Sequence, residues 1–298
     1  MSQPLKILVT GSTGFIGHHF VKDLCSNYEM HLLVRNKNKL VKMGIDLNRV
    51  HVIECDPQGQ WLGQIADPSF DGVVHLASCF LSQHQASDIP NLIRSNIEFP
   101  TQIMEAMSEH IHWWLNMGTF WQHFEDKPHS PVNLYAATKQ SFEDVAQFYA
   151  ETKHFNLIHL KISDTYGNND PRKKLFALWK KQLSEKQPLS MSPGEQQINI
   201  LHVKDVIKGI DRSIQLMSES EQGTYCGKSY ALTAKQVLSL KQLAEVFEKV
   251  AGKPLNIQWG GRPYRPREVM KTWSNFEMLP GWSQEMEISE GISRFLED

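Results

Sequence analysis

The sequence predicts an α/β fold in which a doubly wound parallel sheet is followed by a smaller α+β C-terminal portion. Short apolar, β-branched runs alternate with longer amphipathic stretches through the N-terminal half, which is the pattern of βαβ units. Several of these runs are apolar throughout, as strands covered on both faces should be. The expected strands cover residues 6–9, 31–34, 50–54, 72–76, 113–116 and 157–162.

The clearest helix is expected over residues 134–150. Phe142, Val145, Ala146 and Tyr149 recur there at the spacing of one buried helical face. After about residue 164 the chain becomes rich in turn-forming residues, and prolines interrupt it repeatedly. The later expected elements are a helix ending near 183, a strand at 198–203, a helix at 205–217 and a weak helix from about 289.

These elements predict two units of unequal size. The larger unit covers residues 1–165, and residues 198–217 return to it. The smaller unit combines residues 166–197 with residues 218–298. We therefore expect the smaller portion to receive segments from more than one part of the chain.

Composition narrows the class of protein. The 298 residues are 41% hydrophobic and 21% charged, which is ordinary globular usage and excludes a mainly disordered, collagen-like or coiled-coil chain. The 31 basic and 33 acidic residues leave a formal charge of −2, so nothing global attracts polyanions. We expect no nucleic-acid partner and no membrane partner, and any affinity for anions must be local.

Cysteine usage and the first residues indicate the compartment. The four cysteines form no C-x-x-C pair and are too few to staple this chain, so we expect reduced thiols in a cytoplasmic protein. The first apolar run, at residues 7–9, ends at once in Thr10 and Gly11, and no later run approaches a membrane span. The thirteen histidines include no H-E-x-x-H motif, and no metal site is expected.

A glycine-rich turn follows the first strand directly and precedes an amphipathic stretch. In such turns the glycines permit a tight bend, close approach of the backbone to a pyrophosphate, and close packing of helix on strand. The free N–H groups at the start of the helix then favour the anion. A structural turn without a ligand is the alternative. The residues expected to bind a dinucleotide here are Gly11, Thr13, Gly14, Phe15, Ile16 and Gly17.

The end of the second strand bears on the choice of cofactor. A site selective for NAD usually has Asp or Glu there, about 20 residues past the glycines, to bind the ribose 2′-OH. This chain has Arg35, Asn36 and Lys37 instead. Two cations and an amide suit a 2′-phosphate, and Arg35 could also stack on the adenine. The pattern favours NADP (as NADPH) over NAD, although a solvated basic loop has the same composition.

Tyr135 and Lys139 are four residues apart at the start of the expected helix, which places them on one face, one turn apart. A lysine ammonium beside a phenol favours the phenolate and lowers the tyrosine pKa, as a proton donor to a carbonyl requires. The spacing alone is a frequent chance match. Its position downstream of a glycine turn makes Tyr135 and Lys139 the expected catalytic pair.

With these residues in place, the sequence resembles the extended branch of the short-chain dehydrogenase/reductase superfamily, whose members act on nucleotide sugars. The resemblance covers nearly the whole chain and implies a Rossmann-type fold. It also implies that Asp56 contacts adenine, that Leu76, Ala77 and Ser78 line the cofactor, and that Asn96 is the family's helix asparagine. The motifs, in order, are residues 10–17, Cys55-Asp56, 75–78, Ser95-Asn96, Tyr135 with Lys139, 201–206 and Gly281-Trp282.

Within that branch, residues 116–123, 131–135 and 164–172 look most like sugar-nucleotide 4-ketoreductases of the CDP-abequose or paratose synthase type. This likeness implies reduction of the C4 ketone of a CDP-activated deoxysugar with NADPH. Tyr135 would donate the proton, and Lys139 would lower its pKa and hold the nicotinamide ribose. Two alternatives remain: an epimerase or dehydratase with tightly bound NAD, and a non-catalytic NADP-binding sensor or scaffold.

One position departs from the family pattern. The family places Ser or Thr at the end of the fifth strand to hydrogen-bond the reacting oxygen, and Met117 stands there in this chain. Thr119 is the nearest hydroxyl and is the expected third catalytic residue and a sugar contact. A misalignment by one step, a relocated hydroxyl and a site with impaired redox chemistry all remain open.

The second half of the chain offers cations to a substrate pyrophosphate. Its candidates are Arg172, Lys174, Arg262 and Arg265, with a solvated loop beside Glu268 as the alternative for the last two. The family resemblance adds Asp164 as a polar contact to the sugar. It also implies a homodimer that pairs through helices at 92–107 and 134–150.

Overall fold

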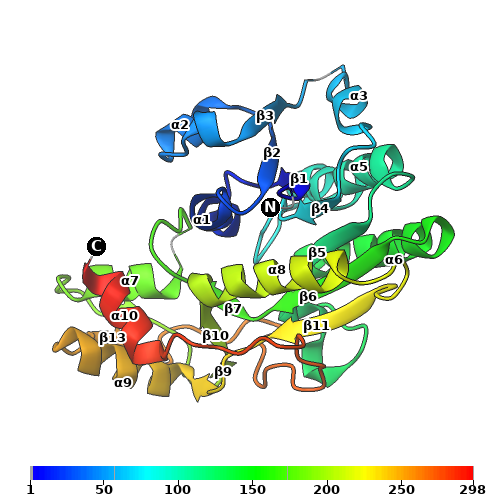
Figure 1. Cartoon of the computed structure of the whole chain (residues 1–298). Coiled ribbons are helices and arrows are strands. Elements are labelled where there is room, and N and C mark those ends of the chain that lie inside the picture. Colours follow the sequence, from blue (N-terminus) through cyan, green and yellow to red (C-terminus); the bar gives the residue numbers. More distant parts are fainter. Residues whose placement is uncertain (1–2, 57, 173, 298) are drawn as a thin grey trace.

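The structure is a computed structural model that describes residues 3–56, 58–172 and 174–297. Its main sheet has seven strands in the order β11-β6-β5-β4-β1-β2-β3, and every neighbouring pair is parallel (Figure 1). The predicted α/β doubly wound fold is confirmed. The strands are β1 Lys6–Thr10, β2 Glu29–Val34, β3 His51–Glu54, β4 Gly72–His75, β5 Trp113–Thr119, β6 Asn156–Ile162 and β11 Lys228–Leu232.

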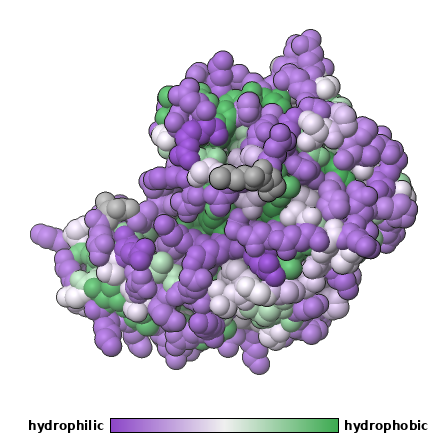
Figure 2. Space-filling model, viewed as in Figure 1, coloured by the Kyte–Doolittle hydropathy of each residue, from purple (hydrophilic) through white to green (hydrophobic). Residues whose placement is uncertain are grey.

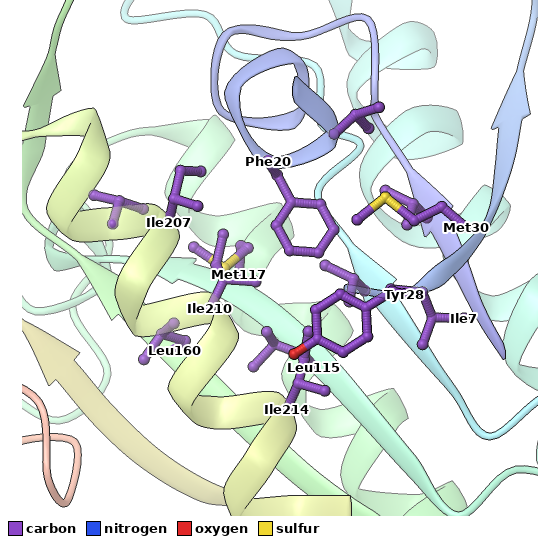
Figure 3. Packing of buried hydrophobic residues seen from close by; sticks show 14 of the residues in the cluster. Ile7, Phe20, Tyr28, Met30, Leu115, Met117, Leu160, Ile207, Ile210 and Ile214 are labelled. Carbon is purple, nitrogen blue, oxygen red and sulfur yellow. The ribbon is translucent and has the colours of Figure 1, made fainter. Parts of the chain in front are cut away.

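Helices cover both faces of this sheet, as a parallel sheet requires. On one face, α1 (Phe15–Leu24) and α8 (Val203–Ser218) pack side by side (Figure 1). Figure 3 shows the core beneath them, where Phe20 of α1 and Ile210 of α8 meet side chains of β1, β5 and β6. The opposite face is covered by α3 (Trp61–Ile65), α5 (Phe99–Met107) and α6 (Leu134–Lys153).

Short elements connect these layers. The helix α2 (Asn38–Lys42) follows β2, and α4 (Ile89–Ile93) runs into a π-helical turn, Arg94–Glu98, and then into α5. Short 3₁₀ turns occur at Leu47–Arg49, Ala86–Asp88, Phe120–Gln122 and Phe124–Asp126.

A smaller portion lies beside the carboxyl ends of the strands and has a core of its own. Trp179 of α7 and Phe247 of α9 pack at its centre, 5.4 Å apart between ring centroids. The capping box of Ser239 and Gln242 starts α9, and Gly252 at φ +65° ends it. The helices are α7 Leu175–Gln182, α9 Leu240–Ala251 and α10 Ile288–Glu297, with short strands β7 Asp164–Tyr166, β8 Leu189–Ser190, β9 Gln197–Ile198, β10 Ile200–His202, β12 Leu238–Ser239 and β13 Ile257–Gln258.

Two features differ from the sequence-based expectations. The strand expected at 198–203 is broken into β9 and β10, which pair with different partners, β12 and β7. Residues 228–232, assigned to the smaller portion, form β11 of the main sheet, where they pair with β6. Tyr230 and Leu232 are buried there beneath α8, which explains why this edge recruits a late segment. The division into two units otherwise stays a prediction.

The surface agrees with the composition. Hydrophilic side chains predominate on the face in Figure 2, and its apolar patches are scattered. Within the described part of the chain, no helix has both the length and the hydropathy needed to cross a membrane.

Candidate active site

The glycine turn between β1 and α1 is shaped by close backbone approach. Gly11 has φ +73°, and a Cβ there would lie 2.4 Å from the backbone nitrogen of Ala77. A Cβ at Gly17 would lie 2.2 Å from the Gly11 carbonyl oxygen. Neither position tolerates a side chain, so the turn, the helix and the loop after β4 meet at the carboxyl ends of β1 and β4. The sheet order reverses between these strands, which is where such folds bind ligands.

The turn also leaves polar groups for an anion. The helix α1 begins after Gly14, and no side chain caps its first turn, so its N–H groups face outward from the helix start. The Ser12 hydroxyl is buried and has no hydrogen-bond partner among the described residues. Thr13 and Ile16 are half-buried in the same turn, and Phe15 is buried. These groups fit the pyrophosphate of a dinucleotide.

The loop after β4 lies against this turn. The Ala77 N–H donates to the Thr10 hydroxyl at 3.1 Å, which brings Leu76, Ala77 and Ser78 to the edge of the glycine turn. Asn96 holds the loop from the other side, because its Oδ1 accepts from the Cys79 N–H at 2.7 Å.

Asn96 is buried, and its amide Nδ2 donates to the Thr138 hydroxyl of α6 at 2.9 Å. The asparagine therefore joins the loop after β4 to the helix that carries Tyr135 and Lys139. A direct contact of Asn96 with a cofactor stays a prediction.

The basic segment after β2 is exposed and lies next to a carboxylate. Arg35 and Asn36 are both exposed, and the Asn36 side chain accepts from the Asn38 N–H at 2.9 Å to start α2. The Lys37 N–H donates to Oε1 of Glu54, the last residue of β3, at 3.2 Å. Sequence reasoning missed Glu54, since only the pairing of β2 with β3 brings it to this loop.

Asp56 already has a structural role. Its carboxylate accepts hydrogen bonds from the backbone N–H groups of Gln58, Gln60 and Trp61, at 2.8, 3.2 and 3.1 Å, and so holds the chain that leads into α3. These bonds lower the pKa of Asp56, whose carboxyl stays ionised. The contact with adenine stays a prediction.

Tyr135 lies in the first turn of α6, which begins where the Asn133 side chain accepts from the Ala136 N–H at 2.9 Å. Its ring packs edge-on against Phe80, 5.0 Å between centroids. The sequence predicted a lowered pKa for this tyrosine. That prediction is wrong for the protein without cofactor, because burial raises the pKa of Tyr135 to about 12 and outweighs the opposing effects of Ser78 and of the charge of Arg172.

Lys139 is buried one turn further along α6. Burial lowers its pKa to about 8, and the carboxylate of Glu143 acts in the opposite direction. Lys139 acts as a cation only while it is protonated, so the residues that compensate its burial matter for the site.

Met117 and Thr119 lie in different environments. Met117 is buried in the core beneath α8, near Leu160 and Ile210 (Figure 3). Thr119 ends β5, and its hydroxyl accepts from the Trp121 N–H at 3.3 Å. It lines a small cavity of about 70 Å³ together with Asp164 and Arg265. The catalytic assignment of Thr119 stays a prediction.

Five of the predicted substrate residues, but not Thr119, meet in a larger cavity of about 620 Å³. Asp164, Arg172, Lys174, Arg262 and Arg265 all line it. Two aromatic residues that sequence reasoning did not assign to the substrate, Phe80 and Trp121, line it as well, and Phe80 connects it to Tyr135. The sequence does offer one indication for Phe80, because this residue closely follows residues 76–78, which are expected to line the cofactor.

Two of the arginines are paired with acids. Arg172 holds both carboxylate oxygens of Asp170 at 2.8 Å, and Arg265 holds those of Glu268 at 3.1 and 3.0 Å. Such bidentate pairs fix the guanidinium planes, and the remaining N–H groups can still meet an anion. Burial lowers the pKa of Lys174, which is half-buried beside them.

A cluster of possible metal ligands lies far from this site. Glu29, His31 and His51 have ligand atoms within 4.8 Å of one another at the amino ends of β2 and β3. The rings of His31 and His51 are stacked, 4.4 Å apart and 18° from parallel, and Nε2 of His31 lies 3.1 Å from Oε1 of Glu29.

A parallel sheet with a dinucleotide-binding turn at its switch point, and a tyrosine-lysine pair next to a cationic cavity, define an NAD(P)-dependent enzyme of the oxidoreductase type. A family model described as the NAD dependent epimerase/dehydratase family matches residues 7–226. The chain belongs to that family.

Curated relatives and solved structures agree with this assignment. The chain is 24% identical to CDP-abequose synthase of Yersinia pseudotuberculosis, over 89% of this chain and 91% of the relative. It is 22% identical to CDP-abequose synthase of Salmonella muenchen, over 98% and 97%. UDP-glucuronic acid 4-epimerase from Bacillus cereus, in complex with UDP-glucuronic acid and NAD, shares the fold with a TM-score of 0.84, 22% identity and 98% coverage of both chains.

A second solved structure is the dTDP-glucose 4,6-dehydratase from Streptomyces venezuelae with NAD and TYD bound. It superposes with a TM-score of 0.78 and 19% identity over 98% of this chain and 96% of that one. At these identities the likeness shows the fold alone, and the reaction has to be argued from the site.

Proposed function

We propose that the protein uses NADPH to reduce the 4-keto group of a nucleotide-activated deoxysugar, with a CDP-sugar favoured. The observation that carries this proposal is the 620 Å³ cavity, which is lined by Phe80, the ring that packs on Tyr135, and by four cations, Arg172, Lys174, Arg262 and Arg265. A diphosphate needs such cations, and a base needs an aromatic surface such as Trp121. The CDP-abequose synthase relatives supply the sugar class.

Different residues would bind the cofactor, donate the proton and exclude water. The glycine turn and the loop at Leu76–Ser78 hold the dinucleotide, and the nicotinamide supplies the hydride when it is bound. Tyr135 gives its hydroxyl proton to the keto oxygen as negative charge develops there. Lys139 adds positive charge beside the phenolate and offers a donor to the ribose. Phe80 and the first turn of α6, both half-buried, limit the access of water, which strengthens these interactions.

The preference for NADPH rests on Arg35, with Asn36 and Lys37 beside it. An exposed guanidinium at the end of β2 suits a 2′-phosphate. Glu54 is an opposing feature, because its carboxylate lies at the same loop and would repel that phosphate. The relatives solved with NAD make the comparison of NADPH with NADH the first measurement.

A second candidate is an epimerase or dehydratase that keeps NAD bound and oxidises its substrate transiently. Glu54 is the structural observation that favours it. Such a protein would be purified with NAD and would consume no external NADPH. A third candidate, a sensor or scaffold without turnover, is favoured by the apolar surroundings of Met117.

One set of assays separates the three candidates. The purified protein is analysed for bound nucleotide and then mixed with NADPH or NADH and CDP-, dTDP- or GDP-linked 4-keto sugars. The proposal expects NADPH oxidation, highest with a CDP-sugar, and its loss in Tyr135→Phe with cofactor binding retained. Turnover that survives in Tyr135→Phe would overturn the assignment of the proton donor.

We also propose that the protein is a homodimer that pairs through α5 and α6. The side chain of Phe148 on α6 is 60% exposed, and Ile93, at the end of α4, is 40% exposed. Sedimentation of the wild type and of Phe148→Glu tests this assembly, and an unchanged mass in the variant would exclude this face.

A further inference from the structure

Behind α6 the sheet carries a row of buried polar side chains. Thr10, His75, Asn116 and His159 are successive register partners on β1, β4, β5 and β6. The Thr10 hydroxyl lies 2.8 Å from Nδ1 of His75, and Nδ2 of Asn116 lies 3.1 Å from Nδ1 of His159. Burial lowers the pKa of both histidines, and the charge of Lys139 lowers it further. Both rings are therefore neutral and provide no counter-ion for Lys139.

The acidic group that acts on Lys139 is Glu143, whose charge raises the pKa of Lys139 against the effect of burial. It follows Lys139 by four residues on α6, so the two side chains share the face that also carries Tyr135. The Glu143 side chain is buried, and its Oε2 lies 3.2 Å from Nζ of Lys161. Its Oε1 is buried and has no hydrogen-bond partner among the described residues. Burying a carboxylate oxygen without a hydrogen-bond partner costs free energy, unless the oxygen interacts with another group.

Glu143 also lines a second cavity, of about 400 Å³, which lies behind the helix. Its other lining groups include Gln140, Asp144, His159 and Lys161. The residues around it are all different from those around the 620 Å³ cavity. Glu143 is thus positioned between a polar cavity on one side and the catalytic lysine on the other.

The surrounding charges keep Glu143 ionised. Burial raises the pKa of Glu143, but the charge of Lys161, whose Nζ lies 3.2 Å from Oε2, acts against it, and the pKa lies below its ordinary value. His123 approaches from the loop after β5, with Nε2 2.8 Å from Nζ of Lys161, and burial lowers its pKa to about 4. Glu143 therefore stays ionised, and its negative charge acts on Lys139.

We propose that Glu143 is a positioning residue of the reaction: its negative charge keeps the buried Lys139 ammonium protonated. This inference rests on the proposed reduction, which consumes one proton. The keto carbon takes a hydride, and the keto oxygen takes the proton of Tyr135. The phenolate then regains a proton from water.

The first test measures Lys139 directly, without cofactor or substrate. The protein is labelled with ¹³C-lysine, and the Cε resonance of Lys139 is assigned by its loss in Lys139→Arg. In Glu143→Gln the pH midpoint of Lys139 should fall by about one unit or more. The matched control is Asp144→Asn, which removes the same charge from the same helix at an exposed position on the same cavity. Its midpoint should equal that of the wild type.

The second test follows turnover. With NADPH and a CDP-4-keto-deoxyhexose, the alkaline limb of the rate profile should move to lower pH in Glu143→Gln and stay in place in Asp144→Asn. In Glu143→Ala, formate that enters the second cavity should restore part of the rate. Asp144→Ala should not respond to formate.

An unchanged Lys139 midpoint in folded Glu143→Gln overturns the proposal. If that variant does not fold, Glu143→Asp decides, because it keeps the charge but withdraws it from Lys139. Its midpoint must then lie below that of the wild type, and an equal value overturns the proposal. A wild type that oxidises NADPH with none of the keto sugars refutes the proposed reduction, and the midpoint of Lys139 still reports on Glu143.

Discussion

The ring of Phe80, in the loop after β4, packs edge-on against Tyr135 in the first turn of α6, with 5.0 Å between the ring centroids, and Ser78 of the same loop lowers the pKa of that phenol. Ser78 also donates to Oδ1 of Asn96 at 3.2 Å, which fixes its position. The residue at which the family resemblance expects a hydroxyl, Met117, is buried in the core instead. Ser78 is therefore a second candidate, beside Thr119, for the relocated hydroxyl.

Replacement of Ser78 separates these two candidates. Ser78→Ala should lower kcat for NADPH oxidation about tenfold, the effect of one lost hydrogen bond of ~1.4 kcal/mol. Thr119→Val should change kcat much less, since the Thr119 hydroxyl is used in the turn with Trp121. The opposite order of the two effects would assign the role to Thr119.

The pH dependence of the reaction should follow Lys139. Its pKa of about 8 means that the rate falls as pH rises through 8, because the ammonium loses its proton. Lys139→Arg keeps a charge at this position and should abolish that limb, whatever its absolute rate. A limb near pH 8 that persists in the arginine variant would have to come from another group.

The lowered pKa of Lys139 should also make the free energy of unfolding depend on pH. The folded-state pKa of Lys139 lies below the ordinary value of 10.5, so between about pH 8 and 10.5 the unfolded chain binds more protons than the folded one. The contribution of Lys139 to the free energy of unfolding therefore rises with pH across this window. Urea unfolding at pH 7.5 and 9.5 checks this sign, and Lys139→Met should show a smaller gain than the wild type.

Cofactor preference should depend on Arg35. Arg35→Ala should weaken NADPH binding about tenfold or more, the effect of losing one charge-assisted contact of ~1.5–3 kcal/mol, and should leave NADH nearly unchanged. Lys42→Ala, which removes an exposed charge from the end of α2, is the control. Fluorescence titration gives both dissociation constants, and equal losses for the two cofactors would exclude a 2′-phosphate contact.

The glycine turn allows a matched comparison of steric and backbone effects. Gly11 and Gly44 have nearly the same φ, +73° and +74°, but a Cβ meets backbone atoms at Gly11 and nothing within 4 Å at Gly44. Gly44→Ala should cost about 1–2 kcal/mol of unfolding free energy from the left-handed backbone alone. Gly11→Ala should cost more and should also abolish NADPH binding. Thermal melts and binding titrations distinguish the two variants.

Much of the fold could be predicted because its signals are local. The first six strands are apolar runs that any parallel sheet would bury, and the spacing of Tyr135 and Lys139 places both on one face of α6 whatever the helix packs against. Gly11 similarly defines the turn through its left-handed backbone, and Gly17 through the absence of a side chain. These features can be predicted because each depends only on residues that are close together in the sequence.

Other parts of the site depend on strand order and register, which no local pattern specifies. Glu54 reaches the basic loop because β3 pairs with β2, and Phe80 and Ser78 reach Tyr135 because β4 lies beside β5 under α6. The pKa of Tyr135 was mispredicted for the same reason, since burial by these distant segments outweighs its local partner. The sequence by itself determined which groups are present and which share a helical face. Only the tertiary structure decided which of them meet, because contacts and burial arise between segments far apart in the chain.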